Sequence, residues 1–320
     1  MNRFDTAPLK LPWHDDYPLT PEDVRSVIAV DLPEFGRAPV DALGDGWDFK
    51  TFLVDGAWVF RFPKRRQCAR QLKRERTLLE ALVTPLSTQS IAIPRYHYFI
   101  DKPRRFALPY AGYPLLRGDA LLSCSVHLVE PRRVGRQLGL FLGALQAAAP
   151  QPAPRSYRDQ FPAYLPDFRR ELDDVATQLP DHLVAACRGL LDAPLQSDPN
   201  PPVYQHADLG AEHILIDPER GDIAAIIDWG DAGWGHTVGD LVGLWAWGGD
   251  AAVAAASAAW QQPLSCADWR RLRLRGAAYA MGSAYYGYKD RRDPLFETAL
   301  GWLERMYANG QLSDPESPDA

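Results

Sequence analysis

The sequence predicts an α/β protein of the α+β type, with a β-rich N-terminal domain containing one main helix (residues 1–108) and a mostly helical C-terminal domain (residues 109–320). The first domain is indicated by residues 40–62, where apolar and polar side chains alternate around two glycine-containing turns, as in antiparallel strands. The second is indicated by apolar residues that recur every three or four positions after residue 130. With 320 residues, 46% of them hydrophobic, the chain can bury cores for two such parts.

The elements of the N-terminal domain follow from local signals. Thr20, then proline and two acidic residues, marks a helix start. Three strands are expected within 40–62 and an amphipathic helix over about 67–82. Two further strands, 94–100 and 105–110, should complete a small sheet, and the second should lead into the hinge between the domains.

The C-terminal domain combines several predicted helices with one predicted β-hairpin. Proline and glycine in 218–222 provide the turn between two short apolar strands, 214–216 and 224–227. The helical pattern occurs over 130–149, 164–179, 181–191, 266–289 and 294–308.

Composition excludes several classes of protein. The four cysteines are far apart and form no C-x-x-C pair, which argues against a structural zinc site or a disulfide framework. The N-terminus lacks the basic start and apolar core of a signal peptide, and Asp250 interrupts the most apolar stretch before it reaches membrane-spanning length. We expect a cytoplasmic monomer or dimer that binds neither membrane nor nucleic acid, because its basic residues are dispersed and its net charge is −6.

Charge is unevenly distributed along the chain. Residues 1–150 carry 21 Lys and Arg against 16 Asp and Glu, which leaves 14 and 25 for residues 151–320, a net charge of +5 against −11. A potential of one sign attracts ligands of the other. The basic half suits a nucleotide polyphosphate, and the acidic half suits a cationic small molecule. Acidic residues also keep protein surfaces soluble.

The predicted hairpin carries the most informative residues. Asp208 and His213 precede its first strand and Asp228 follows its second, so the hairpin can bring all three to one end. This set suits phosphoryl transfer, in which one carboxylate orients the attacking hydroxyl and accepts its proton while other ligands hold magnesium. Asp208 would be the base, with Asp228 and His213 as metal ligands. Imidazole is the weaker ligand, because Mg²⁺ prefers oxygen donors.

The pattern His206-Ala207-Asp208, a second histidine five residues later, and Ile227-Asp228 resembles the aminoglycoside and macrolide phosphotransferases, antibiotic-resistance kinases with a two-lobe protein-kinase-like fold. The resemblance implies a magnesium-dependent enzyme that uses ATP or GTP as phosphate donor. His206 and Asp240 would be structural, with Asp240 bracing the catalytic loop.

The resemblance also assigns a nucleotide site in the N-terminal domain. Gly44, Asp45 and Gly46 form a turn that would cover the phosphates. Arg61 stands where kinases have a lysine on the following strand, and its partner would be Glu75 on the next helix. Lys64 is a second candidate for the phosphate contact, and Glu75 could instead pair with Lys73 or Arg76 on a solvated helix.

The hinge would contact the nucleotide base. Leu108 or Tyr110 would donate the backbone hydrogen bond, because the proline between them has no N–H group. The sequence does not distinguish adenine from guanine.

The acceptor is the least determined part of the prediction. Asp231, Trp234 and Tyr279 are candidates for binding it. The acidic half favours an aminoglycoside antibiotic, whereas the many Trp and Tyr residues suit a macrolide. A metabolite kinase of the same fold remains an alternative, and so does a pseudokinase that only binds nucleotide.

Overall fold

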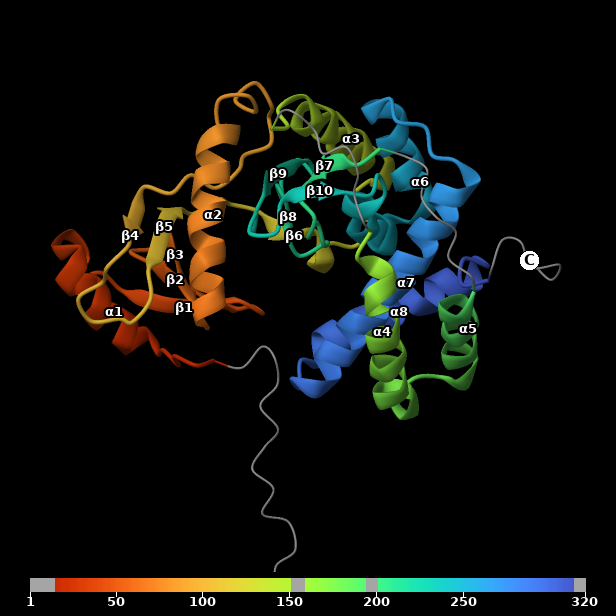
Figure 1. Cartoon of the computed structure of the whole chain (residues 1–320), viewed down its shortest axis with the longest axis horizontal. Helices are drawn as coiled ribbons and strands as arrows, with labels where there is room; N and C mark the ends of the chain where they lie inside the picture. Colours follow the sequence, from red (N-terminus) through yellow and green to blue (C-terminus); the bar gives the residue numbers. More distant parts are fainter. Residues whose placement is uncertain (1–14, 151–158, 194–200, 314–320) are drawn as a thin grey trace, which may run out of the picture. The chain divides into compact units, whose positions relative to one another are not determined.

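The computed structural model describes residues 15–150, 159–193 and 201–313 (Figure 1). The chain forms two compact units: unit 1 comprises Met1–Thr84 and Ile93–Leu116, and unit 2 comprises Pro85–Ala92 and Arg117–Ala320. The expected boundary at 108 falls earlier than this division, before the last strand of unit 1. The prediction about a signal peptide concerns residues outside the described part. No helix in that part is both long and apolar enough to span a bilayer.

Unit 1 is built on a five-stranded sheet whose neighbouring strands are all antiparallel and lie in the order β1-β2-β3-β5-β4. The strands are β1 (Val40–Asp45), β2 (Phe49–Val54), β3 (Trp58–Pro63), β4 (Tyr98–Ile100) and β5 (Tyr110–Pro114). The three strands predicted within residues 40–62 are therefore confirmed.

The two faces of this sheet have different cores. On one face, Phe60 and Phe62 pack with helix α1 (Pro21–Asp31), which begins at the predicted cap residue Thr20. The other face packs with helix α2 (Arg66–Leu82), and Figure 1 shows α2 running alongside the sheet. Because successive side chains of a strand point to opposite faces, Arg61 of β3 lies on the α2 side.

Two further strands complete the sheet as predicted, but the bounds 105–110 expected for the second are wrong. These residues form bends up to Pro109, and β5 begins only at Tyr110. Strand β5 was misplaced because it lies between β3 and β4 and is buried on both faces. Its sequence therefore does not alternate between apolar and polar residues. Gly112 fits there because a Cβ at this position would overlap the ring of Phe60.

Unit 2 contains two small antiparallel sheets. The predicted hairpin is confirmed: β8 pairs with β9, and β6 pairs with the other edge of β8. A separate pair joins β7 to β10. The strands are β6 (Asp119–Ala120), β7 (Val203–Gln205), β8 (Ile214–Ile216), β9 (Ile223–Ile226) and β10 (Gly233–Gly235).

The other long elements in the described part of unit 2 are helices. They are α3 (Pro131–Ala147), α4 (Phe161–Val175), α5 (Asp181–Asp192), α6 (Val242–Trp260), α7 (Cys266–Lys289) and α8 (Asp293–Ala308). Helices α3 and α6 pack closely (Figure 1) because Gly135 and Gly139 leave no side chain between the two backbones. The long helix α7 supports the loop between β7 and β8 through Tyr279, whose ring stacks on Trp302 of α8.

Candidate active site

The loop between β7 and β8 brings Asp208 and His213 together through a tight backbone turn. The N–H of Gly210 donates to the Asp208 carbonyl at 3.0 Å, and the N–H of His213 donates to the Gly210 carbonyl at 3.1 Å. Ala207 and Asp228 have left-handed backbones, with φ of 68° and 65°. Such angles are costly for non-glycine residues and persist where the surrounding structure imposes them, often at functional sites.

His206 and Asp240 hold this loop from beneath. The Asp240 carboxylate accepts hydrogen bonds from the N–H groups of His206 and Ala207, at 2.7 and 2.9 Å. The buried ring of His206 accepts from the Asp208 N–H through Nδ1 and donates from Nε2 to the Ile227 carbonyl, at 3.3 and 3.0 Å. Burial raises the pKa of Asp240 to about 6, although the two N–H donors lower it. These contacts are those that a bracing role requires.

Asp208, His213 and Asp228 meet at one end of the hairpin. His213 Nδ1 lies 2.6 Å from the Asp208 carbonyl and 3.7 Å from a carboxylate oxygen of Asp208. His213 Nε2 lies 3.9 Å from a carboxylate oxygen of Asp228. The histidine is therefore between the two carboxylates, with Nδ1–H donating to the carbonyl and Nε2 facing Asp228.

The pKa of Asp208 is raised to about 7. Removal from water is the first cause, and the negative charges of Glu212, Asp228 and Asp231 add to it against the opposing effect of His213. Because 54% of the Asp208 side chain is exposed, we attribute more of the shift to these carboxylates than to burial. A raised pKa suits a group that must accept a proton near neutral pH.

His213 is shifted upward as well. Burial lowers its pKa, but Asp208, Glu212 and Asp228 outweigh that effect and raise the pKa to about 9. The ring is therefore a cation at neutral pH in this arrangement, and it balances part of the acidic charge around it.

Asp228 is the best donor for a magnesium ion in this site. No group of three or more His, Cys, Asp or Glu side chains within the described residues forms a complete metal site. Magnesium usually takes one or two protein carboxylates and completes its coordination with phosphate oxygens and water. Asp228 fits an ion that arrives with a nucleotide. His213 must lose a proton before it can ligate, so its predicted metal role is the weaker of the two.

Sequence reasoning missed Glu212, which lies within the same loop. The Tyr279 hydroxyl donates to a Glu212 carboxylate oxygen at 2.5 Å and accepts from the Ala211 N–H at 3.2 Å. Tyr279 was predicted to bind the acceptor, but its hydroxyl is already engaged with the loop. Glu212 directly precedes His213, and this adjacency was the only signal in the sequence that could have indicated it.

The other two predicted acceptor residues follow β9. Asp231 is exposed and lies close enough to Asp208 to raise the pKa of that residue. Trp234 is half-buried in β10, and its ring meets Tyr204 edge to face at a centroid distance of 5.5 Å. Their contacts with an acceptor remain predictions.

In unit 1 the structure pairs Arg61 with Glu75. Arg61 Nη1 donates to both carboxylate oxygens of Glu75, at 2.6 and 2.8 Å, and to the Tyr96 hydroxyl at 3.0 Å. The guanidinium group also lies over the Phe49 ring, 4.2 Å from its centroid. Both charged side chains are almost fully buried. The alternative partners of Glu75 are paired elsewhere, Lys73 with Asp101 and Arg76 with Glu80.

The glycine turn between β1 and β2 is tied to the end of β3. Lys64 donates to the Asp45 carboxylate at 2.5 Å and to the Gly46 carbonyl at 2.9 Å. Neither Gly44 nor Gly46 has a positive φ, and the Gly46 N–H donates to the Phe49 carbonyl at 3.0 Å. Lys64 therefore holds the turn, which leaves Arg61 as the better candidate for a phosphate contact.

Leu108 and Tyr110 lie inside unit 1. Leu108 is buried, and Tyr110 is completely buried, with its ring stacked on Phe62 and its hydroxyl donating to Asp31 at 3.0 Å. The chain passes into unit 2 for the last time after Leu116. These contacts concern side chains, so the predicted backbone contact of Leu108 or Tyr110 with a nucleotide base stays a prediction.

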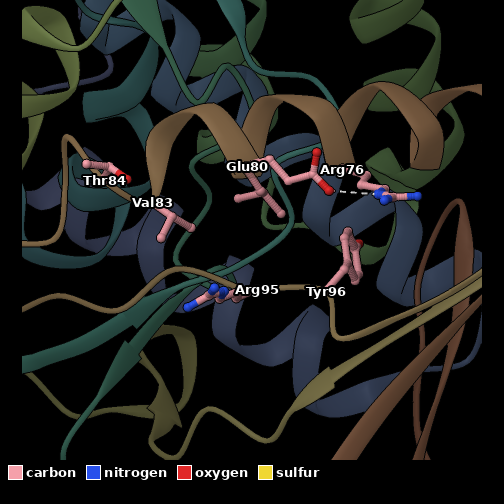
Figure 2. Close-up of a pocket in the computed structure, with 7 residues that line it drawn as sticks. Arg76, Glu80, Val83, Thr84, Arg95 and Tyr96 are labelled. Carbon is pink, nitrogen blue, oxygen red and sulfur yellow. Dashed lines mark hydrogen bonds and ion pairs between the residues drawn. The ribbon is translucent and has the colours of Figure 1, made fainter.

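A pocket of about 280 Å³ lies beside the C-terminal half of α2 (Figure 2). Its walls include Arg76 of α2, the C-cap residue Val83, Arg95 and Tyr96. Tyr96 links this pocket to Arg61, because the same side chain accepts the hydrogen bond from the guanidinium group.

Together, a β-rich unit with a buried Arg–Glu pair and a helical unit with a hairpin-borne Asp–His–Asp set have the parts of a kinase-like phosphotransferase. Residues 40–275 match the profile of the phosphotransferase enzyme family known as APH. The chain belongs to this family. No curated protein sequence matches it.

Solved structures with the same fold include antibiotic kinases. The GDP complex of aminoglycoside 2'-phosphotransferase-IIIa is 24% identical, with a TM-score of 0.68 over 91% of this chain and 100% of that one. Macrolide 2'-phosphotransferase MphH from Brachybacterium faecium is 22% identical, with a TM-score of 0.54 over 86% and 98%. At these identities the likeness shows the two-lobe kinase-like α+β fold, and the substrate has to be argued from the site.

Proposed function

We propose that this protein transfers the γ-phosphate of ATP or GTP to a hydroxyl group of an aminoglycoside, in a reaction that requires magnesium. The observation that carries the proposal is the arrangement of Asp208, His213 and Asp228, in which the exposed Asp208 carboxylate adjoins a candidate magnesium ligand. Asp208 accepts the proton of the acceptor hydroxyl as the new O–P bond forms and the bond to the β-phosphate oxygen breaks.

The remaining residues position the reactants. His213, held by the Asp208 carbonyl, keeps a positive charge beside the base. Asp228 would hold the magnesium ion, which when bound neutralises charge on the phosphate oxygens. In unit 1, Glu75 and Tyr96 fix the orientation of Arg61 for a phosphate contact, and the Asp45–Lys64 pair fixes the turn proposed to cover the phosphates.

The charge around the base favours an aminoglycoside over a macrolide. Glu212, Asp228 and Asp231 all act on Asp208, so the excess negative charge here attracts ammonium groups. The argument for a macrolide depended on aromatic residues, but Trp245 and Trp247 are buried in the core and the Tyr279 hydroxyl is bound to Glu212.

The proposal is tested by incubating the protein with ATP or GTP, Mg²⁺ and a panel of kanamycin, gentamicin, streptomycin and erythromycin, then identifying phosphorylated products by mass spectrometry. We expect phosphate on at least one aminoglycoside. Phosphorylation of erythromycin alone would contradict the choice of acceptor and leave the kinase assignment standing.

A nucleotide-binding pseudokinase is the second candidate, and the engagement of Arg61 by Glu75, Tyr96 and Phe49 favours it. If those contacts keep the guanidinium group from phosphate, nucleotide binds without transfer. Saturable nucleotide binding measured by calorimetry, with no phosphorylated product from any acceptor, would support this alternative.

A further inference from the structure

The carboxylate of Glu212 is held in a fixed place beside the catalytic base. It lies against Gly210, where a Cβ would overlap the carboxylate carbon and both oxygens. The Tyr279 hydroxyl donates to one oxygen at 2.5 Å, and the Ala211 N–H in turn fixes that hydroxyl at 3.2 Å. The Tyr279 ring is stacked on Trp302, with 5.6 Å between centroids. Glu212 is thus oriented by contacts from both the loop and α7.

This half-buried carboxylate has no direct ion-pair partner among the described residues, although the positive charge of His213 lies near enough to interact with it. Across residues 15–150, 159–193 and 201–313, no Lys, Arg or His side chain forms an ion pair with Glu212 within 4 Å. Glu212 shares the charge of His213 with Asp208 and Asp228, so this partly desolvated carboxylate is only partly compensated. A ligand that supplies a further cation would offset the remaining cost.

We propose that Glu212 is a specificity-determining residue that binds an ammonium group of the acceptor next to the hydroxyl activated by Asp208. The inference rests on the proposed function and adds to it the recognition of a cationic group near the reacting hydroxyl. Gly210 lies between the two acidic residues in the turn, so a sugar with an amino group near its reacting hydroxyl can contact both. Tyr279 acts as a positioning residue because it fixes the carboxylate before the acceptor arrives.

A simpler role for Glu212 is to anchor the loop to α7, and Glu212→Gln separates the two roles. The amide oxygen of glutamine still accepts the Tyr279 hydrogen bond, so anchoring is kept while the charge is lost. Glu219→Gln makes the same charge change at an exposed residue of the β8–β9 turn and serves as the control. Tyr279→Phe keeps the stacked ring and removes both hydroxyl contacts.

The experiment first measures phosphate transfer to kanamycin and to erythromycin by the wild-type protein. The compound that receives phosphate is then titrated to obtain its KM. For Glu212→Gln we expect KM for the acceptor to rise about 10- to 100-fold, because a hydrogen bond to a charged group is lost. KM for the nucleotide should stay within about 2-fold of wild type. Tyr279→Phe should give a smaller rise, and Glu219→Gln none. The same measurement is then made with kanamycin derivatives, in each of which a different amino group is replaced by a hydroxyl. For one derivative we expect the wild-type protein and Glu212→Gln to have the same acceptor KM.

An unchanged acceptor KM in Glu212→Gln, with transfer by the wild type intact, would overturn the inference and leave the proposed function standing. A wild-type protein that phosphorylates neither acceptor would overturn the proposed function, and the inference with it. Thermal unfolding of each variant shows whether a loss of affinity reflects a loss of fold.

Discussion

The two units differ in the burial and pairing of their charged side chains. In unit 1, Arg61 and Glu75 are almost fully buried, and Arg61 Nη1 lies 2.6 Å from a carboxylate oxygen of Glu75. Tyr96 and Phe49 also contact the guanidinium group. In unit 2, Asp208 is 54% exposed and has several acidic neighbours, and in the described part of the chain His213 is the cation that acts on it. Buried charges must be paired, whereas an exposed acidic cluster can be left to receive cations from a ligand. The comparison indicates that the charges of unit 1 are paired within the protein, whereas the carboxylates of unit 2 are open to a cationic ligand.

The largest expected effect of any substitution is on catalysis in unit 2. Asp208→Asn removes the proton acceptor and keeps the size of the side chain, so we expect kcat to fall about 10²- to 10⁴-fold. The measurement is steady-state transfer at saturating nucleotide and acceptor. Nucleotide affinity and the unfolding midpoint should stay close to wild type, and a variant with near-normal turnover would show that Asp208 is not the base.

In unit 1 the largest effect should be on stability. Glu75→Gln leaves the buried Arg61 guanidinium without its counter-charge, and we expect the free energy of unfolding to fall by about 3–5 kcal/mol. Denaturant unfolding followed by circular dichroism measures it. The matched control on α2 is Glu80→Gln, whose pairing with Arg76 is exposed to solvent and should change stability by no more than about 0.5 kcal/mol. Equal effects in the two variants would contradict the contrast between the units.

The acidic cluster should also determine the pH dependence of the reaction. Asp208 must be deprotonated to act as base, and its raised pKa of about 7 predicts that kcat/KM for nucleotide, which reports the free enzyme, rises with pH and levels off above about pH 7. Asp231→Asn removes one of the negative charges that raise this pKa, so the rise should move to lower pH. A profile already flat from pH 5 to 8 would show that the cluster does not act on the base.

The smallest effect concerns the strained backbone before Asp208. Ala207 has a φ of 68°, so Ala207→Gly should relieve strain and raise the free energy of unfolding by about 0.5–1 kcal/mol after the greater freedom of glycine in the unfolded chain is counted. Ala211→Gly makes the same chemical change in a buried residue outside the left-handed region and should lower stability. If both variants lose stability, the backbone at Ala207 is not strained.

What could be predicted from the sequence was mostly local. The β8–β9 hairpin and the convergence of Asp208, His213 and Asp228 follow from turn residues and motif spacing. The pairing of Arg61 with Glu75 was implied by the resemblance to the antibiotic kinases. Strand β5 was misplaced because a central strand buried on both faces has no alternation to detect.

Contacts between distant segments left no signal in the sequence. Tyr279 reaches Glu212 from 67 residues away, and Tyr96 reaches Arg61 from 35 residues away. Motif positions also directed attention to His213 and away from Glu212, which directly precedes it. These contacts depend on how helices and strands pack, and a single sequence does not record that packing.

The proposed function depends above all on the acidic residues around Asp208, which would bind a cationic acceptor for the γ-phosphate. Its most direct test is to follow transfer from γ-labelled ATP and GTP to kanamycin across a range of ionic strengths, because salt screens the attraction of exposed charges. We predict labelled kanamycin, an acceptor KM that rises steeply with salt, and no label with Asp208→Asn. Labelled product from Asp208→Asn at the wild-type rate, or an acceptor KM indifferent to salt, would contradict the claim.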